Sequence, residues 1–415
     1  MTSHACRGKC TGLLWGFFLM AILTYLLLYI KLTNRNTPKH HMTAYWLQWI
    51  AFMDSKKINS AFDSSNNESS KFNDSINCIS QNLTTEILDL CQKSERGATD
   101  NGFIPFNKFE YPLEIDMNDL VSNLKTAKNV SIKPIFSYPY TFVKSPTWMC
   151  EYRDVRLLIL VKSGVSHFKR REMIRYTWGN YTESGVVTLF LLGSTPHVMF
   201  QRRILQEHHH YGDILQMSFF DAYYNNTLKT VGGIKWARNH CNQSKFVLFT
   251  DDDFYIATEL LLKYIENMQR FERTSVYRGA MWKRGRPIRN ELNKWYISRQ
   301  DYPFDHYPDF VAAGFMLMSI DFVIDLDLAI PYTKKFIFDD VFISIVAYKL
   351  HVQPSHMNSV HINKFPYNRE GFRQIIASHG YDRTSTLQQA WWIHQNRHLH
   401  KSGRKSIRAY SVRAT

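Results

Sequence analysis

Short apolar runs alternate with segments of helical character between Asp154 and Thr250, and this alternation restricts the fold more than any other feature of the chain. The runs have the length and the β-branched or aromatic content of buried strands. Strands are expected at 155–161, 186–192, 214–217, 246–250, 276–282 and 311–319, and helices at 169–178, 202–210, 221–240 and 259–271. Strands that alternate with helices predict an α/β domain with a mostly parallel central sheet.

Three carboxylates, Asp251, Asp252 and Asp253, directly follow the expected strand 246–250. At the edge of an apolar sheet their charges repel one another and lose hydration. A divalent cation relieves both costs, because hard cations prefer carboxylate oxygens. A solvated acidic turn is the alternative. Ligands of parallel sheets bind outside the carboxyl ends of the strands, and this placement favours the metal site.

A second acidic pair, Asp339 and Asp340, precedes an apolar run of helical length at 341–350. One of these acids is either the N-cap of this helix or a catalytic carboxylate at its start, where the helix dipole favours the ionised form. Gly314, inside the strand 311–319, predicts a close approach of backbone or ligand.

The segment 13–30 is uncharged and Leu-rich, and its 18 residues are just enough to span a bilayer as a helix. A cleaved signal peptide is the alternative, but its apolar region would be shorter and would end in small residues. Seven N-x-S/T sequons follow the segment and indicate that the large C-terminal part is lumenal; they lie at Asn67, Asn73, Asn82, Asn129, Asn180, Asn225 and Asn242.

The expected organisation therefore begins with a cytoplasmic tail at 1–12 and a transmembrane signal anchor at 13–30. Residues 31–150 are rich in Asn, Ser, Thr and Lys, and this polar composition predicts a lumenal stem. The folded domain is expected at 151–400, and a basic C-terminal tail at 401–415.

The net charge of +15 is compatible with nucleic acid, an anionic membrane or an anionic substrate as partner. The basic residues are scattered, without zinc-finger spacing, and this argues against nucleic acid. The four cysteines after residue 30 lack C-x-x-C spacing, so a zinc site is not expected. In an oxidising lumen they allow two disulfides in three possible connectivities, of which their regions favour Cys78 with Cys91 and Cys150 with Cys241.

Six motifs occur in the order found in the β-1,3-glycosyltransferases of the inverting galactosyltransferase-like family. The chain resembles this family over about residues 155 to 395. The matching elements are R-x-x-I-R-x-T-W at 171–178, F-L-L-G at 190–193, D-x-Y-x-N-L-T-L-K-T at 221–230, D-x-D at 251–253, Y-P-x-Y-x-x-G at 307–314 and E-D-V at 338–341.

Segments 294–298, 301–308 and 336–346 are similar to the Brainiac subgroup, whose members add N-acetylglucosamine in β-1,3 linkage to the mannose of a glycolipid core. Two positions depart from the family pattern. Asn226 interrupts the N-L-T-L element, and Ser344 stands where the family usually has glycine after E-D-V. Neither departure removes a reactive group, but both leave the donor sugar open.

The resemblance implies a GT-A fold and an inverting transfer from a UDP-sugar to the 3-hydroxyl of a glycolipid or glycan acceptor, in a single-pass type II protein of the Golgi membrane. A Mn²⁺ ion on the donor phosphates would stabilise the leaving group, with Asp253 as its protein ligand and His379 beside it. Asp340 is expected to take the proton of the attacking hydroxyl, with Asp339 in reserve.

The remaining expected contacts surround the donor. Asp251 and Asp252 are expected to touch the ribose or the outer shell of the metal. Arg171, Arg175 and Lys229 are expected to contact the nucleotide or to hold the loops around it, with a buried ion pair as the alternative for Arg175.

Three tryptophans are also assigned. Trp178 is expected in the core, and Trp282 and Trp295 are candidates for stacking on a sugar ring.

Three questions stay open at this point. N-acetylglucosamine is the preferred donor sugar, with galactose and N-acetylgalactosamine as alternatives. A lumenal lectin without activity is the rival of another class, and the intact Asp253 and Asp340 argue against it. The oligomeric state is not determined, and a homodimer is among the options.

Overall fold

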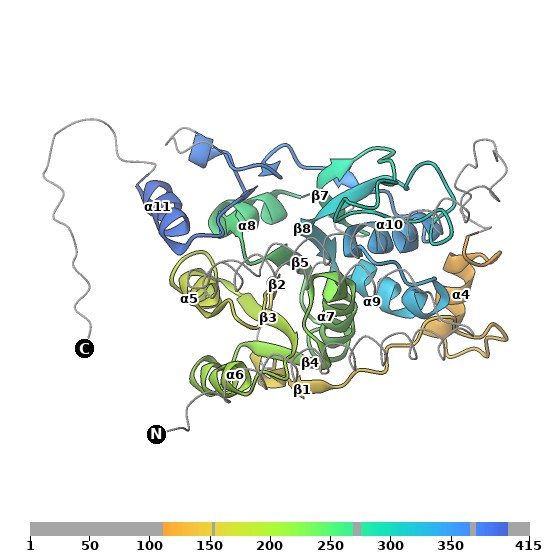
Figure 1. The fold of residues 1–415 in the computed structure, drawn as a ribbon, viewed down its shortest axis with the longest axis horizontal. Coiled ribbons are helices and arrows are strands. Elements are labelled where there is room, and N and C mark those ends of the chain that lie inside the picture. The colour runs from red at the N-terminus through yellow and green to blue at the C-terminus, as the bar shows by residue number, and fades with distance from the viewer. Residues whose placement is uncertain (1–110, 152–153, 269–274, 366–370, 397–415) are drawn as a thin grey trace, which may run out of the picture. The chain divides into compact units, whose positions relative to one another are not determined.

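The structure, a computed structural model of the chain, describes residues 111–151, 154–268, 275–365 and 371–396 (Figure 1). The expected membrane anchor at 13–30, Cys78 with Cys91, and the basic tail at 401–415 lie outside these residues. Within the four described ranges, no helix has the length and apolarity needed to cross a membrane.

An eight-stranded sheet forms the centre of the fold, in the order β1-β4-β3-β2-β5-β8-β7-β9. The four neighbouring strands β4, β3, β2 and β5 are parallel, as the sequence predicts. Outside this centre the sheet is mixed, because β8 runs antiparallel to β5 and β7, and β1 runs antiparallel to β4. The strands are β1 (Phe142–Lys144), β2 (Leu157–Lys162), β3 (Val186–Ser194), β4 (Ile214–Phe220), β5 (Phe246–Asp251), β7 (Tyr277–Trp282), β8 (Phe310–Ser319) and β9 (Ser355–His356).

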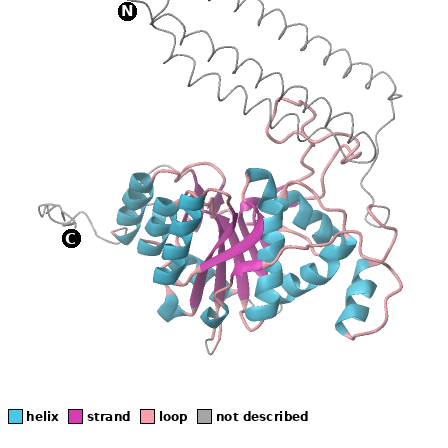
Figure 2. Cartoon of the chain, turned by 60° about the horizontal axis from the view of Figure 1, so that its bottom comes forward, coloured by secondary structure: helices cyan, strands magenta, loops and turns pink. Residues whose placement is uncertain are grey.

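Helices cover both faces of this sheet (Figure 2). Successive residues of β2 alternate between two apolar clusters, since Leu158 and Leu160 belong to one and Leu157 and Ile159 to the other. The first cluster is completed by α4 (Met117–Lys125), α7 (Asn226–His240), α9 (Ile320–Ala329) and α10 (Asp339–Lys349). The second is completed by α5 (Phe168–Tyr176), α6 (Val198–Tyr211), α8 (Thr258–Asn267) and α11 (Thr384–Gln395). Both faces are therefore buried, which explains why the strands are continuous apolar runs.

A small second sheet lies beside the carboxyl end of β5. It has the order β10-β11-β6, with β10 at Val360–His361, β11 at Ala377–His379 and β6 at Phe254–Ile256. Strands β11 and β6 are antiparallel, and their register places His379 opposite Phe254. This pairing brings a distant part of the chain to the acidic turn that precedes β6.

Residues 111–150, which the sequence assigned to the stem, belong to the folded body. Helix α4 buries Met117, Leu120 and Val121 in the first apolar cluster, and β1 pairs with β4. The carboxylate of Asp116 caps α4 by accepting from the backbone N–H groups of Asn118 and Asp119. The predicted boundary at 150 is therefore too late, because three apolar residues on one face of a short polar helix are a weak sequence signal.

Two smaller expectations are confirmed, and a third is confirmed in part. Cys150 and Cys241 form a disulfide, which ties the segment after β1 to the end of α7. Trp178 is fully buried in the core. Gly314 does mark a close approach, but the neighbour is a side chain and not the expected backbone or ligand, because a Cβ at this position would lie 2.1 Å from the ring of Phe254.

Candidate functional site

A buried lysine stands beside the acidic turn at the carboxyl ends of the central strands. Lys162 ends β2 and pairs in register with Asp251, which ends β5. Its ammonium lies 3.1 Å from Oδ1 of Asp251 and 2.6 Å from Oδ2 of Asp339, and it donates to the carbonyl of Ala313 at 3.1 Å. The side chain is only 2% exposed, so its charge depends on these two carboxylates. Burial lowers the pKa of Lys162, but Asp251 and Asp339 more than offset this and raise it.

Helix α10 begins with two acids at this same edge. Asp339 and Asp340 are its first residues, and the N-cap position is Phe338, which makes no side-chain cap. Neither acid is therefore the N-cap, which was one of the two sequence interpretations. Asp339 is buried, and its Oδ2 accepts from Lys162 and from the Thr230 hydroxyl at 2.8 Å. Burial opposes ionisation, but these donors hold the pKa of Asp339 below its usual range.

Asp340 differs from its neighbour in both exposure and charge state. It is partly exposed, and its Oδ1 accepts from the backbone N–H of Val341 at 2.8 Å. Desolvation raises the pKa of Asp340 to about 7, and the ionised Asp339 beside it contributes to the rise. A carboxyl group that ionises near neutral pH and reaches solvent is suited to accept a proton from a bound hydroxyl.

Asp253 and His379 meet at the start of the small sheet. Nε2 of His379 lies 3.4 Å from Oδ2 of Asp253, and this contact raises the pKa of the imidazole. The other oxygen of Asp253, Oδ1, is buried and has no hydrogen-bond partner. A buried carboxylate oxygen without a donor next to an imidazole fits a divalent cation. Among the described residues, no three His, Cys, Asp or Glu side chains are grouped so as to hold a metal ion by themselves.

Asp252 is engaged by the protein itself. Its Oδ2 accepts from the Ser163 hydroxyl at 2.6 Å and contacts Nδ1 of His167 at 2.7 Å, and its Oδ1 accepts from Arg170 at 2.8 Å. Burial disfavours the charge, but these partners hold the pKa of Asp252 at about 2. These contacts fasten Asp252 to the loop that follows β2 and to Arg170 on α5.

Arg171 and Arg175, the two arginines of the motif at 171–178, lie in a largely buried ion-pair cluster. Arg171 is fully buried and forms a two-bond pair with Glu207, and Arg175 forms one with Asp213 and a further bond to Glu207. This is the ion-pair alternative foreseen for Arg175. Arg171 also donates to the carbonyl of Gly164 at 2.7 Å, so the cluster supports the loop after β2.

Lys229, on α7, holds the same loop. Its ammonium donates to the carbonyl of Ser163 at 2.7 Å and pairs with Asp221 at 3.0 Å. Because the lysine is buried, it acts on the loop and not on solvent. Of the two roles expected for the basic residues, the geometry matches the holding of loops.

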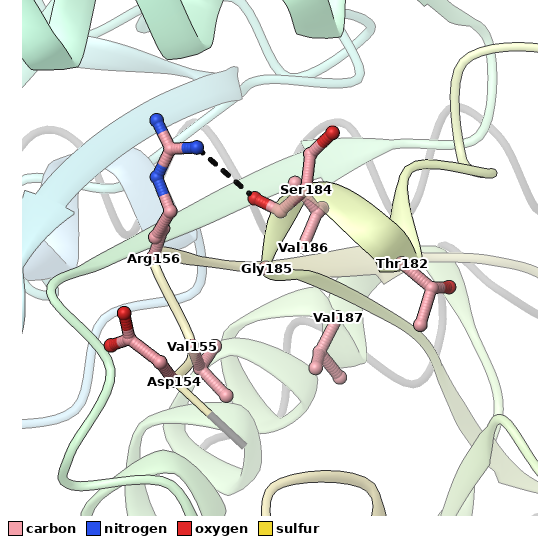
Figure 3. Close-up of a pocket in the computed structure, with 8 residues that line it drawn as sticks. All are labelled: Asp154, Val155, Arg156, Thr182, Ser184, Gly185, Val186 and Val187. Carbon is pink, nitrogen blue, oxygen red and sulfur yellow. Dashed lines mark hydrogen bonds between the residues drawn. The ribbon is translucent and has the colours of Figure 1, made fainter.

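A cavity of about 490 Å³ lies at the other end of the sheet (Figure 3). It is lined at the amino ends of β2 and β3 by Asp154, Val155, Arg156, Thr182, Ser184, Gly185, Val186 and Val187. None of the acids described above lines it. The cavity is therefore separate from the acidic edge, which lies at the carboxyl ends.

Comparisons with known proteins identify the family of the chain. The galactosyltransferase family matches residues 169–358. A β-1,3-galactosyltransferase of Drosophila melanogaster, brn, is 33% identical over 260 residues, which is 61% of this chain and 79% of the fly protein. The chain belongs to the galactosyltransferase family. It is an enzyme of the β-1,3-glycosyltransferase class, as its sequence motifs implied.

Relatives in the family differ in the sugar that their names give. Human lactosylceramide 1,3-N-acetyl-β-D-glucosaminyltransferase is 30% identical over 305 residues, 70% of this chain and 79% of the human protein. Human β-1,3-galactosyltransferase 5 is 33% identical over 269 residues, 61% of this chain and 83% of that protein. The galactosyltransferase family therefore includes both kinds of transferase at similar distance from this chain.

Lys162 and the partners of Asp252 are the site residues that sequence reasoning missed. Lys162 ends an otherwise apolar strand, at the same strand position as Asp251. A lysine directly after an apolar strand was the available signal. Ser163 and His167 follow it in the loop and carried no signal of their own.

Proposed function

We propose that the chain is an inverting β-1,3-glycosyltransferase of GT-A type, which transfers N-acetylglucosamine from UDP-N-acetylglucosamine to the 3-hydroxyl of a sugar on a glycolipid or glycoprotein. The observation that supports this best is the arrangement of two acidic groups at one sheet edge. Asp253 with His379 stands at the end of β5, Asp340 stands at the start of α10, and Lys162 bridges the neighbouring Asp251 and Asp339.

Asp253 and His379 would hold Mn²⁺ together with the donor phosphates. Metal ions in nucleotide sites are commonly held by one or two carboxylates, with phosphate oxygens and water completing the shell. When bound, the metal neutralises charge on the departing diphosphate. The unpartnered Oδ1 of Asp253 is the feature of this chain that favours the assignment.

Asp340 would act as the general base. Inversion needs a single displacement in which the acceptor hydroxyl loses its proton as it attacks the anomeric carbon. Asp340 is the partly exposed acid of the pair and has a pKa of about 7. Asp339 is buried against Lys162, so it remains ionised and orients the start of α10.

Galactose is the second candidate for the transferred sugar. Two relatives named above are galactosyltransferases, and one is an N-acetylglucosaminyltransferase. N-Acetylglucosamine is preferred because of the similarity to the Brainiac subgroup at 294–298 and 301–308. N-Acetylgalactosamine is a further alternative.

The site is proposed to face the lumen of the Golgi, in a type II protein anchored by residues 13–30. The disulfide between Cys150 and Cys241 supports an oxidising compartment. Asn129, Asn180 and Asn242, three of the predicted sequon residues, are exposed.

The experiment is a transfer assay with the purified full-length chain in detergent. UDP-N-acetylglucosamine, UDP-galactose and UDP-N-acetylgalactosamine are each tested with Mn²⁺ on glycolipid and oligosaccharide acceptors. A β-1,3-linked N-acetylglucosamine product, identified by linkage analysis, is expected. An α-linked product or the absence of turnover with all three donors would contradict the proposal.

A further inference from the structure

Two exposed aromatic side chains stand near the acidic edge and have no part in the steps above. Trp295, in the loop between β7 and β8, is 46% exposed, and Tyr223, in the short helix η3 (Tyr223–Asn225), is 50% exposed. Trp and Tyr that keep a ring face in water while a polar atom is bonded are well suited to ligands with one apolar face.

The two rings are fixed to each other. The indole N–H of Trp295 donates to the hydroxyl of Tyr223 at 3.1 Å, and the hydroxyl of Tyr224 donates to the carbonyl of Lys294 at 3.2 Å. The ammonium of Lys294 lies 4.3 Å from the centroid of the Trp295 ring. We call Tyr223, Lys294 and Trp295 the aromatic platform. Because its members are held before any ligand arrives, binding there costs little ordering.

The aromatic platform is attached to the start of α10. Helix η3 leads directly into α7, whose Thr227 hydroxyl donates to the carbonyl of Ile337 at 2.8 Å. One turn later, the Thr230 hydroxyl bonds Asp339 at 2.8 Å. The first turn of α7 is thus fastened to the residues on either side of the cap of α10.

Charge supports the same placement. Burial raises the pKa of Tyr223, and the carboxylates of Asp340, Asp339 and Asp251 add to the rise. These acids therefore lie within electrostatic range of the Tyr223 hydroxyl. Together with the bonds from α7 to Ile337 and Asp339, this places the platform near the start of α10.

We propose that the aromatic platform binds a pyranose ring of the acceptor glycan and presents its hydroxyl to Asp340, which presupposes the transferase activity proposed above. A pyranose chair has a face of C–H groups that packs on an indole and a rim of hydroxyls that accept hydrogen bonds. Trp295 supplies the apolar surface, the ammonium of Lys294 lies over its ring, and the hydroxyl of Tyr223 supplies a polar partner beside the indole N–H.

A second ligand that stacks on aromatic rings is the uracil base of the donor. The acceptor is favoured because α7, which follows the platform, is bonded to the start of α10, where the proposed base lies, whereas the donor phosphates are assigned to Asp253 and His379 at the start of the small sheet. The two ligands predict opposite changes in kinetics, so measurement of both Michaelis constants separates them.

The test compares Trp295→Ala with Trp392→Ala in the full-length chain, using the donor and acceptor that the wild type turns over fastest. Trp392 lies on α11, is 51% exposed and serves as the matched control. Loss of one stacking surface is expected to raise the KM for the acceptor about tenfold in Trp295→Ala, with the donor KM unchanged. The control variant is expected to match the wild type.

A second, smaller change tests the platform in case Trp295→Ala misfolds. Tyr223→Phe keeps the ring and removes only the hydroxyl, and it is expected to raise the acceptor KM about threefold. If neither variant changes the acceptor KM, or if the donor KM rises instead, the aromatic platform is not an acceptor site. If the wild type turns over no donor, the proposed function is wrong. Calorimetric binding of the glycolipid and oligosaccharide acceptors of the assay panel to wild type and Trp295→Ala would then still test the platform, and equal affinity for every acceptor would refute it.

Discussion

The ammonium of Lys162 lies 2.6 Å from the carboxylate of Asp339, and this contact joins the carboxyl end of β2 to the first residue of α10. Because Lys162 also pairs with Asp251 at 3.1 Å, one buried cation connects the proposed donor side of the site to the proposed base side. The two acidic groups are therefore kept at one edge by an interaction inside the protein.

Replacing Lys162 is expected to damage stability and activity together. Lys162→Met leaves two acids without their buried cation, and loss of one partner of a buried pair costs about 3–5 kcal/mol. Denaturant unfolding should show this loss, and kcat should fall at least about a hundredfold. In the control Lys263→Met, an exposed surface pair with Glu259 is lost, and the change should stay below about 1 kcal/mol.

A double variant checks that Lys162 and Asp339 act as one unit. Lys162→Met combined with Asp339→Asn removes both charges, so it should be more stable than Lys162→Met alone. If the two single losses simply add, the contact is not energetically coupled.

The rate should depend on the ionisation of Asp340. Its carboxyl must be ionised to accept a proton. The value of kcat/KM should therefore be highest above the pKa of about 7 and fall about tenfold per pH unit below it. Asp339→Asn removes the neighbouring negative charge, so the fall in kcat/KM should move to lower pH. A profile that is flat from pH 5.5 to pH 8.5 in assays at saturating Mn²⁺ would exclude Asp340 as the base.

Mn²⁺ binding should depend on Asp253 more than on His379. Asp253→Ala removes the unpartnered carboxylate oxygen and should abolish measurable Mn²⁺ binding in the presence of UDP. His379→Ala should weaken binding about 10- to 100-fold. Electron paramagnetic resonance of free Mn²⁺ measures both. His209→Ala, on the exposed end of α6, should bind as the wild type does, and equal binding by all three variants would exclude this metal site.

The sequence predicted the strands of the sheet centre and the acids at their ends, because both depend on local patterns. The run before Asp251 is apolar enough to predict a buried strand whichever strands it pairs with. Ligands bind outside the carboxyl ends of such strands. His379 could be named only through the family resemblance, since its place beside Asp253 depends on the pairing of β11 with β6.

The partners of the basic residues were not predictable in the same way. Arg171 and Arg175 are paired by Glu207 and Asp213, which lie on α6 and just before β4. No local pattern marks an acid on another helix as the partner of an arginine. The β1 edge and α4 were missed because their apolar faces are short and lie in polar sequence.

The arginine cluster should contribute to stability rather than to donor affinity. Arg175→Met leaves Asp213 and Glu207 short of a partner and should cost about 3–5 kcal/mol, while the donor KM stays unchanged.

The same cluster should make stability depend on pH. Burial raises the pKa of Glu207, but Arg171 and Arg175 outweigh this and lower it. Because the folded pKa is depressed, this stabilisation is present above the ordinary value of 4.5 and is lost as pH falls below it. Unfolding midpoints measured from pH 7 to pH 3 should converge for wild type and variant. A large rise in donor KM would instead indicate contact with the nucleotide.

The most direct test of the account is transfer by Asp340→Asn, compared with Asp321→Asn, which changes an exposed acid in the first turn of α9. Asp340→Asn should reduce kcat by at least about a thousandfold while calorimetry shows unchanged binding of the UDP-sugar with Mn²⁺, and Asp321→Asn should behave as the wild type. Normal turnover by Asp340→Asn would contradict the assignment of the base and with it the proposed mechanism.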